Sequence, residues 1–250
     1  MSGSPGTEWV HASLAPQARP DTIDVWRFPL SRHLDDWTLL CDQERERAQR
    51  FIRDVHRDRY VAGRATLRRI LGSYLSVPAE RLAFRYGVHG KPGVDSEQKL
   101  TFNLSNSESV AVVAVGVGRR LGIDVERSKE GRGLDAIARR FFSEREYADW
   151  LHCNAAERRT GFYDYWACKE SYLKAWATGL SFPSRRFTVL AACTPYPRVG
   201  ATEMPGDDPS RWWLLRLDAF VGYSACLCVE VSPGEELRPR YWDWAREAAS

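Results

Sequence analysis

The sequence has no apolar run near the length of about 20 residues that an α-helix needs to cross a bilayer. Its first 20 residues mix Gly, Ser, Pro and His, and they lack the basic start and apolar stretch of a secretory signal. These two absences predict a cytoplasmic protein without a membrane partner.

The sequence also lacks the motifs of three common ligand sites. It contains no GxxxxGK[ST], GxGxxG or HExxH, so the signatures of phosphate-binding P-loops, dinucleotide sites and zinc peptidases are missing. The six cysteines form no CxxC pair, which predicts free, reduced thiols. With 44% hydrophobic and 28% charged residues, the chain resembles neither a disordered nor a fibrous protein. These observations predict a folded protein of one or two domains.

Arginine is concentrated in one part of the chain, although the formal net charge is only +3. Nine arginines lie between residues 45 and 69, and such a concentration suits a polyanionic ligand. A nucleic-acid-binding protein is therefore one alternative. It predicts binding that weakens steeply with salt and does not respond to Mg²⁺ chelation.

Apolar spacing predicts several helices. Between residues 43 and 75 apolar side chains recur every three or four positions, which indicates one long helix or two consecutive helices. Ser143 and Glu146 form a capping-box pattern that opens another helix, and Gly179 with Pro183 is expected to end a longer one. The remaining helical spacing covers residues 134–142 and 162–177.

Short β-branched or aromatic runs predict strands between these helices. The expected strands are residues 110–117, 121–125, 212–217 and 224–231. Pro195 to Pro209 is expected to be an exposed loop. Both halves of the chain run through helix and then strands, and NSESVAVVAV loosely echoes VGYSACLCVEV. An internal duplication is one explanation of this echo, and chance similarity between strands is the other.

GIDVER carries two acids, Asp124 and Glu126, that lie two residues apart on an expected strand. Because strand side chains alternate, both carboxylates point to the same face. Two carboxylates on one face suit a hard cation such as Mg²⁺, which prefers oxygen ligands and often shares its shell with phosphates. A half-buried strand with a solvated acidic face gives the same pattern, so the motif alone leaves both interpretations open.

The segment WACKESYLKAWATG places Glu170 and Lys174 four residues apart, on one face of an expected helix. An acid and a base in this arrangement suit a metal ion next to a phosphate. An ordinary surface ion pair has the same spacing. Glu146 is a further acid, and its capping box is a sufficient structural explanation for it.

Two polar segments precede the expected strand at residues 110–117. GKP presents Lys91 from a glycine-bearing turn, where a lysine can reach a phosphate, and FNLSNS gathers small hydrogen-bonding side chains. A solvated turn explains the first segment, and local side-chain to backbone bonds explain the second almost as well.

Taken in order, GKP, FNLSNS, GIDVE, RFFSEREY and WACKESYLKAWATGLSF resemble the signature series of the Sfp-type 4′-phosphopantetheinyl transferases. The resemblance extends from Arg47 to Phe187, and GIDVE together with WACKES is its most specific part. It implies an α+β fold of two similar halves related by a pseudo-twofold axis, with the active site between them. The expected divisions are a flexible extension at 1–20, an N-terminal half at 21–118 and a C-terminal half at 119–250.

The resemblance also implies the reaction. A monomeric, Mg²⁺-dependent enzyme would transfer 4′-phosphopantetheine from coenzyme A to a serine of an apo acyl or peptidyl carrier protein, with Mn²⁺ as the alternative ion. Such carriers belong to fatty acid, polyketide or nonribosomal peptide synthases. By the same resemblance the metal ligands are Asp124, Glu126 and Glu170, the coenzyme A contacts are Arg47, Lys91, Ser105, Asn106 and Lys169, and the catalytic residues are Glu146 and Lys174.

Two of these residues have implied chemical roles. Glu146 matches the family's candidate for the base that takes the serine proton, because a serine hydroxyl is a poor nucleophile at neutral pH. Lys174, together with the metal, would stabilise the negative charge that grows on the departing adenosine 3′,5′-bisphosphate.

One position departs from the family pattern. The family usually has histidine after the serine in FNxSHS, whereas this chain has Asn106, which cannot carry a positive charge. A weaker phosphate contact is therefore expected. The alternative function is a non-catalytic module that binds coenzyme A or a carrier protein on the same scaffold. The acidic residues argue against a nucleic-acid partner.

Overall fold

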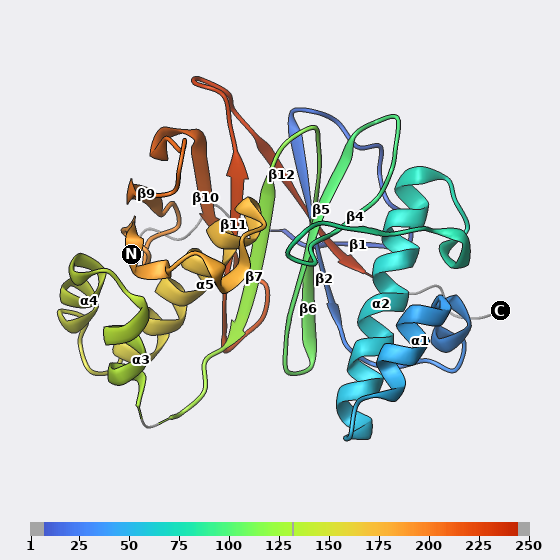
Figure 1. The fold of residues 1–250 in the computed structure, drawn as a ribbon, viewed down its shortest axis with the longest axis horizontal. Helices are drawn as coiled ribbons and strands as arrows, with labels where there is room; N and C mark the ends of the chain where they lie inside the picture. The colour runs from blue at the N-terminus through green and yellow to red at the C-terminus, as the bar shows by residue number, and fades with distance from the viewer. Residues whose placement is uncertain (1–7, 132, 245–250) are drawn as a thin grey trace.

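The computed structural model describes residues 8–131 and 133–244. Figure 1 shows the strands of two sheets in the middle of the molecule, with α1 and α2 on one outer side and α3 and α4 on the other. The predicted α+β class is confirmed. None of the helices in these residues combines the length and the apolar character that crossing a membrane requires.

The helices follow the apolar spacing closely. Residues 43–75 form two consecutive helices rather than one, and Glu44 of the first pairs with Arg64 and Arg68 of the second at 2.6 and 2.7 Å. Two of the nine clustered arginines therefore form ion pairs inside the protein. In the described part of the chain the α-helices are α1 (Asp42–Gln49), α2 (Asp54–Leu75), α3 (Leu134–Phe141), α4 (Glu144–Leu151) and α5 (Arg158–Trp176).

Helix α5 ends two residues earlier than its glycine suggested. Ala177 takes the left-handed conformation, with φ of 58°, and Gly179 lies in the 3₁₀ turn that follows. The N–H groups of Ala177 and Thr178 donate to carbonyls of the last turn, on Leu173 and Lys174. These bonds close the helix and offset the strain of a non-glycine residue at a positive φ.

A five-stranded sheet and a three-stranded sheet form the middle of the molecule. The first has the order β1 (Val10–Ala12), β12 (Arg238–Trp244), β2 (Thr22–Pro29), β6 (Val110–Val117) and β5 (Leu100–Ser107). The second has the order β10 (Trp212–Arg216), β11 (Tyr223–Glu230) and β7 (Leu121–Arg127). Two small hairpins complete the strands, β3 (Arg85–Tyr86) with β4 (Pro92–Gly93) and β8 (Phe187–Leu190) with β9 (Arg198–Thr202).

The two ends of the described chain lie together in the five-stranded sheet. Strand β12, from the C-terminal end, runs parallel to both of its neighbours, β1 and β2. Next to β1, Trp9 packs 5.4 Å from Tyr241, and the Arg27 guanidinium lies 4.4 Å from the Trp9 ring. Residues 10–12 therefore depart from the expected flexible extension, because a distant strand pairs with them.

The space between the two sheets is a shared apolar core. Ile23 and Val112 of the five-stranded sheet and Ile123 of the three-stranded sheet are fully buried in one cluster. Each half has a further core under its own helices. The region from Pro195 to Pro209 contributes Val199 and Met204 to the core of the C-terminal half, which corrects its assignment as an exposed loop.

Candidate active site

Strands β5 and β7 meet at the seam between the halves, and they contact each other through side chains. Asn103, Ser105 and Ser107 of β5 accept hydrogen bonds from backbone N–H groups of β7 at 2.8, 3.3 and 3.1 Å. The donors are Ile123, Val125 and Arg127. The accepting side chains lie two residues apart on β5 because alternate side chains of a strand point to the same face. This pattern fixes the register of one half against the other.

Asp124 lies on β7 at this seam and is only 2% exposed. Its Oδ1 accepts hydrogen bonds from Ser105 Oγ at 2.9 Å and from Lys174 Nζ at 2.6 Å, and Lys174 also donates to Ser105 at 2.9 Å. Its Oδ2 is buried and has no hydrogen-bond partner in the described part of the protein. Three residues expected at the site are thus in direct contact, and one carboxylate oxygen remains available.

Glu126 and Glu170 complete an acidic group around Asp124. Burial, followed by the neighbouring Asp124, raises the pKa of Glu126 to about 7, and Ser107 donates to its carboxylate at 3.0 Å. Burial and Asp124 also raise the pKa of Glu170. The three predicted metal ligands therefore feel one another's charge, and a positive ion among them would relieve the repulsion.

The chemistry of these donors fits Mg²⁺, which binds carboxylate oxygens, and the unpartnered Oδ2 of Asp124 is a free ligand atom. As they stand, however, no three or more His, Cys, Asp or Glu side chains within residues 8–131 and 133–244 are grouped to hold a metal ion. In this structure Lys174 supplies the positive charge next to Asp124.

Gly122 determines how closely α5 approaches β7. A Cβ atom at this position would lie 2.1 Å from the carbonyl oxygen of Ser171 and 2.4 Å from the nitrogen of Ala175. Any side chain would push the helix away from the strand. The glycine therefore lets α5 bring Glu170 and Lys174 close to Asp124.

Glu146 and Lys169 lie together in the interior, apart from this acidic group. The Lys169 ammonium donates to both carboxylate oxygens of Glu146, at 2.7 and 2.6 Å, and to the carbonyl of Phe187. Glu146 is 0% exposed and also accepts the backbone N–H groups of Ser143 and Val189. Burial raises the pKa of Glu146 and lowers the pKa of Lys169.

This placement bears on two expectations, whose roles stay predictions. In this conformation the Glu146 carboxylate is fully buried and fully hydrogen-bonded, so it is not placed to meet a carrier serine. Lys169, which is 2% exposed and already donates three hydrogen bonds, is likewise not placed to contact coenzyme A. Its neighbour Glu170 projects from a different face of the helix, about 100° away, and feels the charge of Asp124.

A cavity of about 220 Å³ lies next to β5 and contains two more of the expected residues, Arg47 and Asn106. Arg59 and Arg64 also line it, although they pair with Glu108 and Glu44 respectively. Ser105 and Asn106 are neighbours that face opposite sides, because strand side chains alternate. Strand β5 thus separates the arginine-lined cavity from the acidic group.

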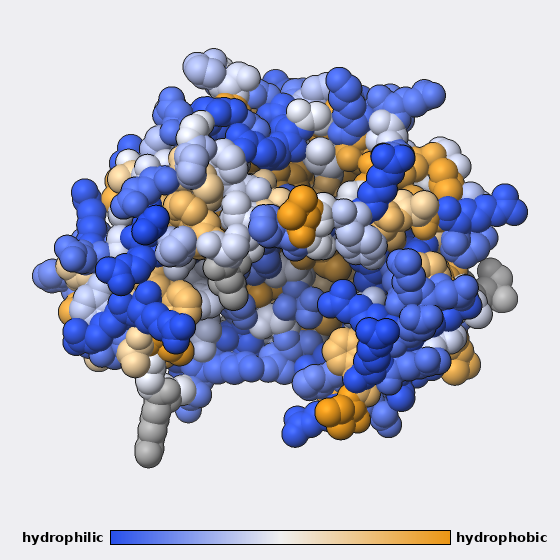
Figure 2. Space-filling view, in the orientation of Figure 1, coloured by the Kyte–Doolittle hydropathy of each residue, from blue (hydrophilic) through white to orange (hydrophobic). Residues whose placement is uncertain are grey.

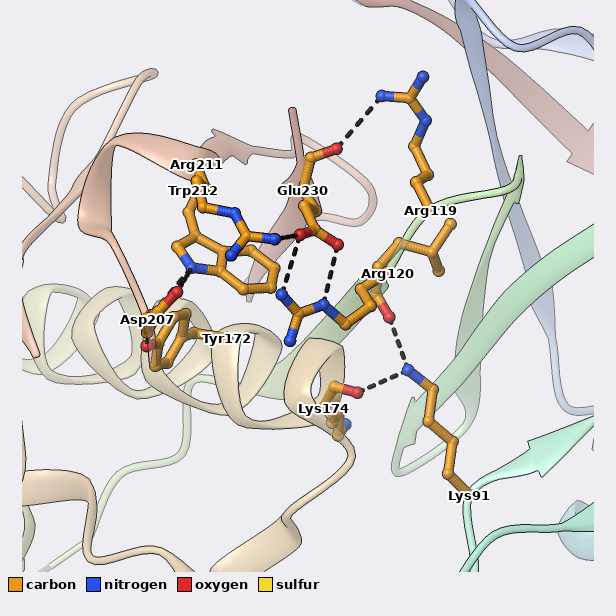
Figure 3. A network of polar contacts seen from close by, with 10 residues as sticks. Lys91, Arg119, Arg120, Tyr172, Lys174, Asp207, Arg211, Trp212 and Glu230 are labelled. Atoms are coloured by element: carbon orange, nitrogen blue, oxygen red, sulfur yellow. Dashed lines mark hydrogen bonds and ion pairs between the residues drawn. The ribbon is translucent and has the colours of Figure 1, made fainter. Parts of the chain in front are cut away.

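Lys91 was expected to contact a coenzyme A phosphate, but its ammonium bonds the protein backbone instead. It leaves the β3–β4 hairpin, and its ammonium donates to the carbonyls of Leu121 and Lys174 at 2.8 and 2.6 Å. Figure 3 shows this side chain reaching the end of α5. The flanking residues Gly90 and Pro92 line the cavity, whereas the Lys91 ammonium crosses to the other half.

Both halves of the chain match models of known protein families. The family model described as the 4′-phosphopantetheinyl transferase superfamily matches residues 120–228, and the model of the 4′-phosphopantetheinyl transferase N-terminal region matches residues 25–117. The 4′-phosphopantetheinyl transferase HetI of Nostoc sp. is 34% identical over 231 residues, which cover 90% of this chain and 93% of HetI. The chain belongs to the 4′-phosphopantetheinyl transferase family.

Other members of the 4′-phosphopantetheinyl transferase family are similar over most of their length. The transferase Sfp of Bacillus subtilis is 30% identical over 203 residues, which cover 80% of this chain and 88% of Sfp. The transferase gsp of Aneurinibacillus migulanus is 34% identical over 165 residues, or 64% of this chain and 66% of that protein. The resemblance drawn from the sequence motifs is confirmed.

Sequence reasoning on this 4′-phosphopantetheinyl transferase missed three residues at the seam. Asn103 and Ser107 bond to β7, and Gly122 admits α5. A signal for the first two was present, since Asn103, Ser105 and Ser107 have the same two-residue spacing as Asp124 and Glu126. Treating FNLSNS as a strand would have placed all three side chains on one face.

Proposed function

We propose that this chain transfers the 4′-phosphopantetheine group of coenzyme A to a serine hydroxyl of an apo acyl or peptidyl carrier protein and releases adenosine 3′,5′-bisphosphate, with Mg²⁺ or Mn²⁺ as the metal. The proposal rests chiefly on the acidic group at the seam, where Asp124 contacts Lys174, and where burial and then Asp124 raise the pKa values of Glu126 and Glu170. Membership of the family supports the reaction type.

The cavity next to β5 is the proposed site for the nucleotide end of coenzyme A. Arg47 is exposed at this cavity, so its charge can meet a phosphate, and Asn106 can donate a neutral hydrogen bond. Ser105 faces the acidic group on the other side of β5. A coenzyme A molecule that passes this strand would place its nucleotide by the arginines and its pyrophosphate by the carboxylates.

The proposed roles at the pyrophosphate follow from charge. Asp124, Glu126 and Glu170 would hold Mg²⁺, which neutralises phosphate charge when it is bound. Lys174 lies next to Asp124 and would stabilise the negative charge that grows on the leaving adenosine bisphosphate. In this structure the same ammonium is held by Ser105 and Asp124, so its position is fixed before substrate arrives.

The serine proton needs an acceptor other than Glu146. Among the described residues, Glu170 is the member of the acidic group to which no side chain donates a hydrogen bond, whereas Ser105 and Lys174 donate to Asp124 and Ser107 donates to Glu126. We assign this role to Glu170, either directly or through one water.

The types of synthase that own the carrier proteins, the monomeric state and a cytoplasmic location stay predictions from the sequence. The rival function is a family scaffold that binds coenzyme A or a carrier without transfer. The acidic group favours transfer, because simple binding of coenzyme A does not need three carboxylates that feel one another's charge.

Intact mass spectrometry of an apo carrier protein, incubated with the chain, coenzyme A and Mg²⁺, tests the proposal. We expect a gain of about 340 Da, which chelation of the metal abolishes. Glu170→Ala should lose the gain, whereas Glu203→Ala, a change of the same kind at an exposed glutamate, should keep it. No gain with several carriers, while coenzyme A still binds, would favour the binding module.

A further inference from the structure

Lys91 reaches from the N-terminal half to the C-terminal half near the active site. It starts in the β3–β4 hairpin of the N-terminal half and donates to Leu121 O on β7 and Lys174 O on α5, at 2.8 and 2.6 Å. In the sequence these partners lie 30 and 83 residues away. Figure 3 shows that Lys91 ends between the start of β7 and the last turn of α5.

Both carbonyls suit a positive charge. Lys174 O lies in the last turn of α5, where the helix dipole is negative, and it also accepts the backbone N–H of Ala177. Leu121 precedes Gly122, at which α5 and β7 come into direct contact. The Lys91 ammonium therefore joins the helix and the strand at the point where they cross.

The opposite side of α5 is held by a second cation. The Arg120 guanidinium lies 3.9 Å from the Trp176 ring and bonds Glu230 through two nitrogens, at 2.8 and 2.9 Å. Figure 3 shows Arg120 and Lys91 approaching the helix end from different sides. Arg120 comes from the same half as α5, whereas Lys91 comes from the other half and bonds the backbone of the helix.

The Lys91 ammonium is also largely removed from solvent. Burial, together with the positive Lys174 and Arg120, lowers its pKa to about 8. A lysine placed to receive a phosphate from solvent would be more exposed and less committed to backbone oxygens. The geometry describes a tie between elements rather than a waiting ligand contact.

We propose that Lys91 is a positioning residue, which ties the N-terminal hairpin to the crossing of α5 and β7 and thereby holds Lys174 against Asp124. This inference rests on the proposed function, because the positioned pair acts in that reaction. It replaces the expectation that Lys91 contacts a coenzyme A phosphate. The two roles predict opposite kinetic effects, since a phosphate contact serves binding and a positioning contact serves the chemical step.

Steady-state kinetics of Lys91→Met separate the two roles, with a carrier protein and varied coenzyme A. Methionine keeps the length of the side chain and removes the ammonium. We expect kcat to fall about tenfold or more and KM for coenzyme A to stay within about twofold. Lys91→Arg, which keeps the donors, should recover part of kcat, and Lys99→Met, the same change at an exposed lysine, should leave both constants unchanged.

A KM about tenfold higher with unchanged kcat would overturn the inference and return Lys91 to the coenzyme A contacts. Amide hydrogen exchange of the full-length protein gives a readout that needs no activity. Residues 171–178 should exchange about tenfold faster in Lys91→Met than in Lys99→Met, because the last turn of α5 loses the contact between its Lys174 carbonyl and the other half. Equal exchange would reject the tie, whether or not the wild-type protein transfers phosphopantetheine. An inactive wild type with faster exchange in Lys91→Met would reject only the proposed function.

Discussion

Lys169 and Glu170 are adjacent on α5, but they belong to two different charged groups. Lys169 points into the interior, where Glu146 accepts two of its hydrogen bonds and two backbone N–H groups besides. Glu170 points to β7, where three carboxylates share the neighbourhood of one ammonium, Lys174. The interior pair is fully satisfied, whereas the acidic group has an excess of negative charge and a free oxygen on Asp124.

This difference separates structural from functional charge. A satisfied buried pair has no capacity left for a ligand, so it contributes to the fold alone. An unsatisfied group stores electrostatic repulsion that a cation can relieve, and such imbalance is typical of sites that bind or react. The motif WACKES therefore holds one residue of each kind, side by side in the sequence.

The largest expected effect comes from breaking the interior pair. Lys169→Met leaves Glu146 buried without its counter-charge, which should lower the free energy of unfolding by about 3–5 kcal/mol. Lys174→Met removes the counter-charge of Asp124, which is also buried, but Mg²⁺ bound among the carboxylates should replace that charge, so with Mg²⁺ present this variant should lose less stability while transfer is abolished. Urea denaturation in Mg²⁺ and carrier modification measure the two effects. Equal losses of stability in Mg²⁺ would mean that the two pairs do not differ in this way.

A smaller effect is expected from removing one charge of the acidic group. The pKa of Glu126 is raised in the folded protein, so between about pH 4.5 and 7 the folded state binds more protons than the unfolded state. Stability from this group is therefore present at low pH and is lost as pH rises through about 7. Glutamine is neutral throughout and avoids that loss.

Glu126→Gln should consequently raise the free energy of unfolding by about 1–2 kcal/mol at pH 8 in metal-free buffer and change it little at pH 4. Thermal denaturation at both pH values measures this. Added Mg²⁺ should stabilise the wild type more than the variant. A variant that is less stable than the wild type at pH 8 would contradict the picture of stored repulsion.

The smallest expected effect concerns the cavity on the other side of β5. Asn106 lines it without charge, and Asn106→His would add a residue that can carry a proton. A charge-assisted phosphate contact is worth about 1 kcal/mol more than a neutral one, so KM for coenzyme A should fall about fivefold. Kinetics at pH 6 and 8 check the origin, since the gain should be larger at pH 6. An unchanged or higher KM would exclude this contact.

Local signals predicted much of the fold. A run of β-branched residues located β6 to the residue, and helical periodicity placed α3 and α5 within a few positions. The capping box of Ser143 and Glu146 was also recognisable, and the structure contains it. These features depend on neighbours a few residues away, which a sequence displays directly.

The errors concern partners that are distant in the chain. The residues next to Glu146 in the sequence give no sign that Lys169 is its counter-ion. Likewise, the residues around GKP do not indicate that Lys91 turns toward α5 rather than toward the cavity. Strand β1 needs β12, whose pairing joins opposite ends of the sequence. The family motifs brought Asp124, Ser105 and Lys174 together, which the structure places in direct contact, but they did not distinguish this group from the buried pair of Glu146 and Lys169.

The position of β12 has a consequence for how the protein is made. Strands β2, β5 and β6 leave the ribosome long before β12, which must then enter between β1 and β2. Until that happens one edge of β2 is unpaired, and unpaired edges invite association with other chains. The first half cannot finish folding during its own synthesis, so expression of residues 1–118 alone should give an aggregating fragment rather than a stable half-enzyme.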